Sequence, residues 1–368
     1  FINNLSKTRK TLAASLKDQI ESLVSMLNSG GVIGIDIGSH SIKLCELGGS
    51  LGKLKVDRFA VLPLSEAAII EDEIQKFSEV TDTVKELIRV TGTKSKNVCI
   101  GLYGPNTMTK RMNVPEGSQE EIEDHVMWES EQYITFGADD SKIDFDIIGE
   151  NEGGGNEVFV VAAHNELIAA FSDVIKESKL NTKFVDLNVV ALSNVFEEVY
   201  RETDGSYLLL DMGASSTKIV IFKRGAPLFT KELPIGGGLI TEEIQRQMAV
   251  SYEEAEDLKT TYDSRGNLPE EILNIVQTQI ELQVSEIKKN VNFYITAGST
   301  EKVDQCFVTG GNSLTVGMID FLRQAMGIDV DRLDLFHNIK INESQFDLSA
   351  EEFSAIASIV VGLAMRKF

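Results

Sequence analysis

An eight-residue pattern that occurs twice constrains the fold of this chain more than any other feature. The pattern, D-x-G-x-x-S-x-K, occupies residues 36–43 and recurs 175 positions later at residues 211–218. Each copy lies between two short hydrophobic runs, which predicts a strand, a tight turn and a second strand. Recurrence at one fixed offset is typical of internal duplication. Because there are only two copies, we expect two related α/β halves that face each other, not a solenoid.

The residue types in the two copies suit the binding of nucleotide phosphates. A glycine in a tight hairpin, Gly38 or Gly213, lets backbone N–H groups approach phosphate oxygens, and the serines add hydroxyl donors. Asp36 and Asp211 end the first strand of each copy and would direct carboxylates into a shared cleft. Two carboxylates can hold a hydrated Mg²⁺ ion that bridges to the phosphates. The repeat therefore predicts a nucleotide clamp.

A third glycine-rich segment fits the other end of a nucleotide. The hydrophobic residues 305–309 lead into Gly310-Gly311-Asn312, after which we expect a helix over residues 314–326. The missing side chains permit close contact with a base or ribose, and a helix N-terminus favours negative charge. One glycine turn alone is more often a plain hairpin. The three segments in this order predict one nucleotide cleft.

The composition limits the class of protein. The 368 residues allow two or three domains, and the formal net charge of −22 disfavours non-specific binding to nucleic acid or anionic lipid. The three cysteines lie far apart without metal-ligand spacing, which favours a reducing compartment. The longest uncharged apolar run, residues 353–365, is shorter than the roughly 20 residues that span a bilayer. We therefore expect no transmembrane helix and no secretory signal.

Hydrophobic periodicity predicts helices between these motifs. Residues 1–30 combine an apolar helical stripe with four basic residues and lead into a glycine-rich linker. The acidic helix at residues 118–133 is expected to begin with a capping box of Ser118 and Glu121. Two further helices are expected at residues 72–90 and 269–297.

The order of these elements is similar to that of the actin-like ATPase superfamily: phosphate hairpin, connecting helix, second phosphate hairpin, adenosine turn and closing helix. Within it, the chain resembles the PilM family of type IV pilus assembly, relatives of the cell-division protein FtsA, over about residues 32–366. The Trp-Glu-Ser-Glu-Gln-Tyr-Ile stretch is characteristic of this family. The segments that carry the resemblance are residues 34–39, 128–136, 235–237, 241–245, 250–256 and 362–366.

The resemblance implies an α/β fold, a two-lobed actin-like ATPase of ribonuclease H-like repeats with an FtsA-like inserted subdomain. The expected parts are an N-terminal amphipathic helix with its linker (1–31), the first-lobe core (32–96 and 165–204), the inserted subdomain (97–164), the second lobe with nucleotide-binding elements (205–350), and a C-terminal helix that returns to the first lobe (351–368).

The resemblance also implies residue roles. Asp36 and Asp211 would lie near the metal. Asn188 lies near the position where relatives orient the attacking water, and since an amide is not a strong base, we expect slow ATPase turnover or none. His40 is expected to be an ordinary loop histidine. Glu286 and Lys289 on the long helix are similar to base-flanking positions of heat-shock chaperone ATPases and are implied to bind the nucleotide. The other implied nucleotide-binding residues are Gly38, Ser39, His40, Ser41 and Lys43 in the first hairpin, Gly213, Ala214, Ser215 and Ser216 in the second, and Gly310, Gly311 and Asn312 at the adenosine.

The function implied is that of a cytoplasmic scaffold of pilus assembly, peripheral to the inner membrane, that binds ATP and Mg²⁺. The PilM family docks the cytoplasmic N-terminal tail of PilN, a membrane protein, in a groove between the first lobe and the inserted subdomain. Other inner-membrane pilus components and a second copy of the chain are further implied partners. Contact with the membrane would run only through partners, and no nucleic acid is expected.

Two other functions stay open at this point. A filament-forming ATPase like FtsA would self-associate with ATP. A small-molecule kinase of the same superfamily would need a carboxylate base in the cleft and a substrate pocket. Residues 1–30 also allow several interpretations: a native segment, a fused partner segment that fills the groove, or a helix that docks to another partner or to a membrane surface.

Overall fold

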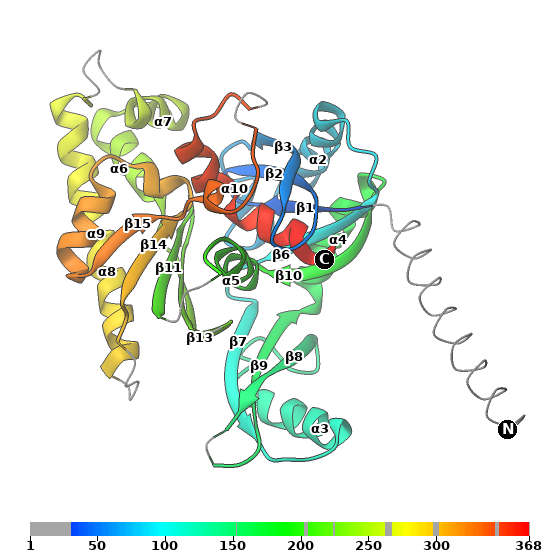
Figure 1. Cartoon of the computed structure of the whole chain (residues 1–368). Helices are drawn as coiled ribbons and strands as arrows, with labels where there is room; N and C mark the ends of the chain where they lie inside the picture. The colour runs from blue at the N-terminus through cyan, green and yellow to red at the C-terminus, as the bar shows by residue number, and fades with distance from the viewer. Residues whose placement is uncertain are drawn as a thin grey trace, which may run out of the picture.

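The two expected lobes and an inserted subdomain are visible in the computed structural model of the chain (Figure 1). The structure describes residues 31–367, except 152, 202–204, 224, 262–266, 297–301 and 343–345. The helix expected within residues 1–30 lies outside the described residues. Two five-stranded sheets and one three-stranded sheet form the frame, so the prediction of a two-lobed α/β fold is confirmed.

The first lobe is a five-stranded sheet covered on both faces. Residues of β1 alternate between two hydrophobic clusters: Ile33 and Ile35 pack with α2 and α4, while Val32 packs with α5 and α10. Every residue of β1 is therefore buried, which explains its continuous apolar run. The sheet order is β10 (Asn181–Leu187), β6 (Asn97–Leu102), β1 (Val32–Ile37), β2 (Ser41–Gly48) and β3 (Lys55–Pro63), and the helices are α2 (Phe77–Thr91), α4 (Asn165–Glu177), α5 (Asn188–Val199) and α10 (Ala350–Ala364).

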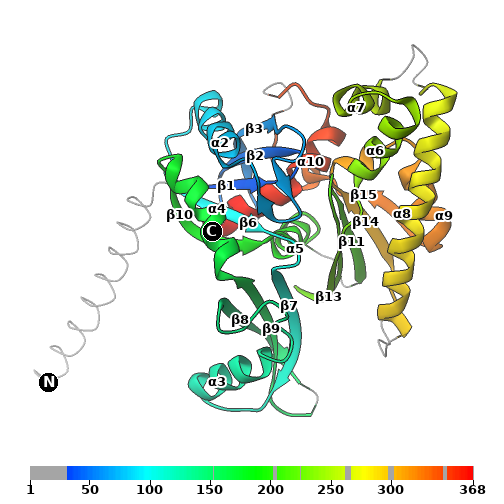
Figure 2. The same ribbon diagram turned by 180° about the vertical axis from the view of Figure 1, so that it is seen from behind.

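The second lobe repeats this strand order. In both lobes the strand that ends in the repeated aspartate pairs antiparallel with the next strand and parallel with a later one. Three of its helices, α6, α8 and α9, pack on the face of the sheet away from the first lobe (Figure 2). The order is β13 (Ala226–Leu233), β12 (Thr217–Lys223), β11 (Ser206–Met212), β14 (Gln305–Thr309) and β15 (Asp329–Arg332), with α6 (Gly237–Met248), α7 (Tyr252–Thr260), α8 (Glu270–Thr296) and α9 (Met318–Met326).

The inserted subdomain lies below the first lobe in Figure 1 and consists of a small sheet and one helix. Its strands lie in the order β7 (Thr107–Val114), β9 (Asn156–His164) and β8 (Ser141–Glu150), and α3 (Gln119–Ser130) packs on them. The predicted capping box of Ser118 and Glu121 is confirmed at the start of α3. β6 pairs within the first-lobe sheet, so the separate sheet begins at β7.

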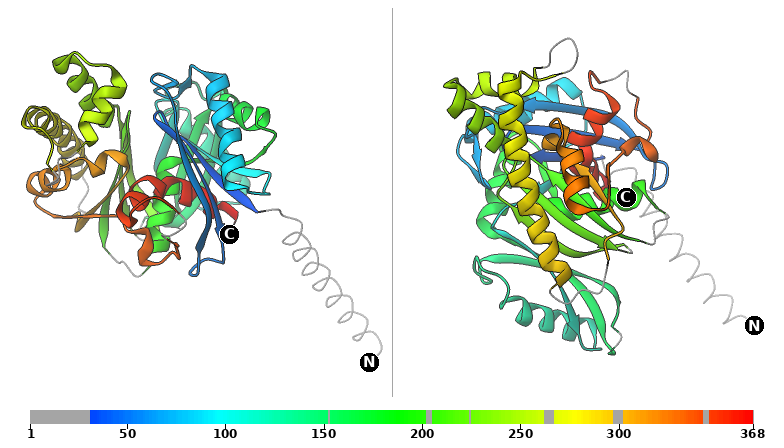
Figure 3. Two further views of the ribbon diagram at one scale, coloured as in Figure 1. Left: turned by 90° about the horizontal axis from the view of Figure 1, so that it is seen from above. Right: turned by 90° about the vertical axis from the view of Figure 1, so that its left-hand side faces the viewer.

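The C-terminal helix α10 lies between the two lobes (Figure 3). It crosses β1 at Gly34, where a Cβ atom would come within 2.4 Å of the Val360 carbonyl oxygen. On the second lobe, the N–H of Gly310 donates to the carbonyl of Ala355 at 2.8 Å. The helix therefore belongs to the core of the first lobe and also supports the turn after β14. Within the part of the chain that the structure describes, no helix combines the length and the apolar character needed to cross a bilayer.

The structure corrects two of the expected helices. Helix α2 begins at Phe77, not at residue 72, because Asp72 is buried against Asn106 and residues 73–74 form the short strand β5 (Glu73–Ile74) with β4 (Ile69–Ile70). The helix expected over residues 314–326 is a short 3-10 turn, η1 (Gly311–Leu314), followed by α9. Gly317, in the left-handed region with a φ of 87°, separates the two. The glycine turn therefore does not open an α-helix.

Candidate functional site

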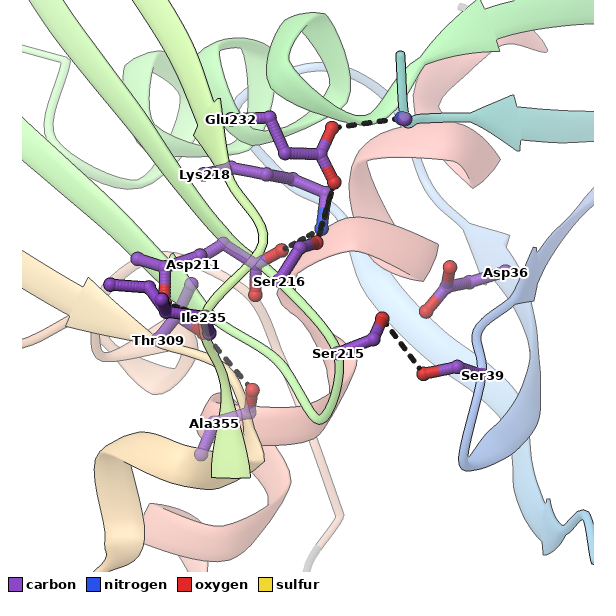
Figure 4. A network of polar contacts seen from close by, with 12 residues as sticks. Asp36, Ser39, Asp211, Ser215, Ser216, Lys218, Glu232, Ile235, Thr309 and Ala355 are labelled. Carbon is purple, nitrogen blue, oxygen red and sulfur yellow. Dashed lines mark hydrogen bonds and ion pairs between the residues drawn. The ribbon is translucent and has the colours of Figure 1, made fainter. Parts of the chain in front are cut away.

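One cavity of about 690 Å³ lies between the two lobes, and both copies of the repeat line it. Asp36 and Asp211 come from different lobes and face this same cavity. At its mouth the two hairpins touch, because the Ser39 hydroxyl donates to the Ser215 hydroxyl at 3.0 Å (Figure 4). The duplicated motif therefore forms a single site.

The two hairpins share one local geometry because they share one spacing. In each, the glycine N–H donates to the serine carbonyl three residues later: Gly38 to Ser41 at 3.2 Å and Gly213 to Ser216 at 2.9 Å. The aspartate and lysine of the pattern are direct partners across the antiparallel pair. Their side chains form ion pairs, 3.1 Å from Lys43 Nζ to Asp36 and 3.3 Å in the second copy. The spacing of seven thus places one ammonium beside each carboxylate.

Lys218 of the second copy lies in a buried network that the sequence analysis did not single out as a site. Its Nζ is 3.3 Å from Asp211, 3.9 Å from Glu232 and 5.2 Å from the centre of the Tyr103 ring. Burial lowers the pKa of Lys218, but Asp211, Glu232 and Asp36 raise it more, so that the pKa lies above its ordinary value. Lys218 is therefore a fixed positive charge at the inner wall of the cavity. Its place in the repeat, equivalent to Lys43, was a signal that could have identified it.

The turn after β14 forms another wall of the cavity. Gly310 has a φ of 86°, and a Cβ atom there would come within 2.3 Å of the Met212 carbonyl oxygen, so the position requires glycine. The buried Asn312 donates through Nδ2 to Gln283 Oε1 at 2.9 Å, and Gln283 Nε2 donates to the Gly236 carbonyl at 3.0 Å. Gln283 of α8 therefore ties this turn to the glycine loop before α6. It is a positioning residue that no sequence motif indicated.

A charged cluster on α7 faces the first hairpin. Lys259 Nζ donates to Glu256 Oε1 at 2.6 Å and to the Thr241 hydroxyl at 2.8 Å, and Glu256 and Lys259 both line the cavity. Desolvation lowers the pKa of His40 and the ammonium groups of Lys259 and Lys43 lower it further, against an opposing effect of Glu256. The pKa of His40 therefore lies below its ordinary value. Glu256 and Lys259 belong to or adjoin the family segment 250–256, which the sequence analysis did not assign to the site.

The structure brings most of the expected site residues together. Those that line the cavity are Asp36, Gly38, Ser39, His40, Ser41, Lys43, Asn188, Asp211, Gly213, Ala214, Ser215, Ser216, Gly310, Gly311 and Asn312. Glu286 and Lys289 do not line it. They form an exposed ion pair of 3.4 Å on α8, because that helix turns Gln283 and Ile287 inward instead.

Asn188 begins α5, is buried and lines the cavity. Its Oδ1 has no hydrogen-bond partner among the described residues and lies against β6, within 2.0 Å of where a Cβ atom of Gly101 would stand. An amide in this place can orient a ligand atom but cannot remove a proton from water. The expectation of slow turnover remains a prediction.

The donor set fits a magnesium nucleotide. The described residues hold no cluster of three or more His, Cys, Asp or Glu side chains that could enclose a metal ion. The cavity offers two carboxylates, and a Mg²⁺ ion commonly completes a shell of this kind with water and phosphate oxygens. Asp36 and Asp211 would hold the ion, and it would supply charge neutralisation of the phosphates. Backbone N–H groups, serine hydroxyls and Lys43 surround the same space.

Comparisons with known proteins agree with this architecture. A family model described as type IV pilus assembly protein PilM matches residues 34–368. A solved PilM–PilN type IV pilus biogenesis complex has a similar chain, with a TM-score of 0.81 and 22% identity over 92% of this chain and 98% of that one. The ethanolamine utilization protein EutJ from Carboxydothermus hydrogenoformans has a TM-score of 0.54 and 16% identity, over 90% and 88% of the two chains.

A third solved structure, diol dehydratase-reactivating factor in its nucleotide-free form, has a TM-score of 0.52 and 10% identity, over 91% of this chain and 99% of that one. At these identities the solved structures show a shared fold and nothing more. The family match, in contrast, spans the first hairpin, the inserted subdomain, the second hairpin and α10. The chain therefore belongs to the family of type IV pilus assembly proteins PilM.

Proposed function

We propose that this chain is an ATP-binding scaffold that docks the cytoplasmic tail of a PilN-like membrane protein in the type IV pilus inner-membrane complex. One observation carries the nucleotide part of the proposal: Asp36 and Asp211, from two separate lobes, line one cavity. Each carboxylate has a lysine beside it. This combination of acid, ammonium and hydroxyl groups suits a magnesium-bound triphosphate.

The docking part of the proposal rests on family membership and on the complex in which the similar PilM chain was solved with PilN. The groove would lie between the first lobe and the inserted subdomain. A peptide held there would keep the protein at the cytoplasmic face of the inner membrane through its partner. We expect turnover to be slow or absent, because the Asn188 amide supplies no base.

The nucleotide site can be tested by calorimetry with ATP in the presence and absence of Mg²⁺. We expect Asp36→Asn and Asp211→Asn each to lower ATP affinity at least about tenfold, since each removes a charge that faces the metal. Chelation of Mg²⁺ by EDTA should weaken binding by the wild type in the same direction. The matched control is Asp82→Asn, because Asp82 is an exposed residue of α2 that pairs with Lys85 and does not line the cavity. Unchanged affinity in both cleft variants would exclude this site.

The partner can be tested with a synthetic peptide of the cytoplasmic N-terminus of the PilN protein encoded in the same genome. We expect saturable one-to-one binding by fluorescence anisotropy. A peptide of the same composition in scrambled order is the control, because it preserves charge and hydrophobicity. Equal binding of the two peptides would contradict specific docking.

A further inference from the structure

The inserted subdomain is joined to the first lobe through a narrow neck, residues 103–106, between β6 and β7. Gly104 has a φ of 93°, and a Cβ atom there would come within 2.7 Å of Asp72. Asn106 Nδ2 donates to the Asp72 carboxylate at 3.0 Å, and the Asn106 carbonyl accepts from the N–H of His164 at 3.0 Å. The outgoing and returning strands are therefore fastened together at this point.

The first residue of the neck, Tyr103, also lines the nucleotide cavity. Its ring packs edge-on against Phe171, with 6.3 Å between the centres, and Lys218 lies over its face. Burial raises the pKa of Tyr103, and the carboxylates of Asp36, Glu232 and Asp72 raise it further, so the hydroxyl stays protonated.

A protonated hydroxyl needs an acceptor. The Tyr103 oxygen is buried, yet it has no hydrogen-bond partner among the described residues. Buried donors are nearly always satisfied, because leaving one unpaired is costly. The ring lies beside the Lys218 and Asp36 end of the cavity, not among the residues of the turn after β14. The acceptor that this place suits is an anionic oxygen at the phosphate end of a ligand.

The second residue of the neck is linked to the second hairpin through Glu232 of β13. Gly104 N–H donates to Glu232 Oε2 at 2.8 Å, and the other oxygen of Glu232 accepts from the Ser216 hydroxyl at 2.5 Å. Figure 4 shows the Glu232 carboxylate next to Lys218 and Ser216 in this network. A shift of the second hairpin would therefore move Gly104, which lies in the neck that leads to the inserted subdomain.

We propose that the neck responds to the terminal phosphate of the bound nucleotide. The Tyr103 hydroxyl donates a hydrogen bond to that phosphate, and the Gly104–Glu232 contact is the link to the inserted subdomain. This inference rests on the proposed nucleotide site and goes beyond it, because it predicts that the protein binds and responds to ATP and ADP differently. Tyr103 is a ligand-contacting residue in this account, and Glu232 is a positioning residue.

The first test is Tyr103→Phe in the full chain, titrated with ATP and with ADP in the presence of Mg²⁺. Phenylalanine keeps the ring packing on Phe171 and removes only the hydroxyl. We expect ATP affinity to fall about tenfold, the effect of losing one hydrogen bond to a charged group, while ADP affinity stays within about twofold. The matched control is Tyr200→Phe, because the Tyr200 hydroxyl accepts from Asp334 N–H away from the cavity. This variant should leave the ATP-to-ADP affinity ratio unchanged.

The second test uses the single tryptophan of the chain, Trp128, which lies on α3 of the inserted subdomain and is 64% exposed. We expect saturating ATP, but not ADP, to change its fluorescence in the wild type, and the change to be absent in Tyr103→Phe at saturating ATP. A full ATP response in that variant, or an unchanged ATP-to-ADP ratio while the wild type binds ATP, overturns the inference and leaves the nucleotide site standing. If the wild type binds neither nucleotide, the proposed function and the inference fail together.

Discussion

The two phosphate hairpins have the same spacing and the same backbone, but their lysines lie in different environments. The Lys43 side chain is 15% exposed and has one carboxylate partner, Asp36. The Lys218 side chain is 7% exposed and lies between Asp211, Glu232 and the Tyr103 ring. The Lys43 ammonium is therefore less enclosed than that of Lys218. The same motif gives a partly exposed charge in one lobe and a buried charge shared by two carboxylates in the other, and we expect the partly exposed charge to be the one available to a phosphate.

The largest effect should come from replacing the buried lysine. Lys218→Met leaves Asp211 and Glu232 without their cation, and breaking a buried ion pair costs about 3–5 kcal/mol. The matched variant is Lys43→Met, which we expect to cost no more than about 2 kcal/mol, because it leaves one carboxylate without its cation instead of two and removes a more exposed ammonium. Urea unfolding followed by circular dichroism measures both. Equal losses in the free energy of unfolding would show that the two lysines have the same role.

A smaller effect should follow from filling the contact between β1 and α10. In the repeat, Gly34 corresponds to Leu209, so only the first lobe lets the closing helix approach its central strand this closely. Gly34→Ala should cost about 1–3 kcal/mol of unfolding free energy through overpacking. Gly149→Ala is the control, because no atom lies within 4 Å of its added Cβ. A thermal shift no larger than that of the control would contradict the close approach.

A third effect should be seen in the nucleotide affinity when Lys43 is replaced. Lys43→Met should weaken ATP binding about tenfold, since one ammonium contact to a phosphate is lost. Lys55→Met is the control, because Lys55 forms an exposed pair with Asp57 outside the cavity. Calorimetry at fixed salt compares the two variants. If Lys43→Met leaves the ATP affinity unchanged, Lys43 does not contact a phosphate, and the two hairpin lysines do not differ in this function.

The smallest effect should come from the contact where the hairpins meet. Ser39 and Ser215 form an exposed hydrogen bond of 3.0 Å. A double-mutant cycle with Ser39→Ala and Ser215→Ala should give a coupling of no more than about 1 kcal/mol in unfolding free energy, because water replaces an exposed partner. A larger coupling would mean that the tip contact holds the lobes together.

Local patterns in the sequence were enough to predict much of the fold. The alternation and repeat predicted β1, β2, β11 and β12, and the capping box at Ser118 predicted the start of α3. The same patterns predicted that Asp36 and Asp211 face one cleft. The strand β3 was not predicted. Its exposed residues Lys55, Asp57 and Arg58 interrupt the regular alternation of apolar and polar residues that indicates a strand. The start of α2 was wrong because a tertiary contact of Asp72 overrides helical periodicity.

The amino-acid sequence by itself determined the two hairpins, because the D-x-G-x-x-S-x-K spacing specifies a turn and a cross-strand pair through short-range geometry. Only the tertiary structure decided what surrounds each copy. Tyr103 lines the cavity from the neck after β6, and Glu232 and Gln283 hold residues that line it from β13 and α8. Glu286 and Lys289 are turned away from the cavity by the packing of α8. Burial and long-range contacts depend on how whole elements pack, and no local spacing encodes them.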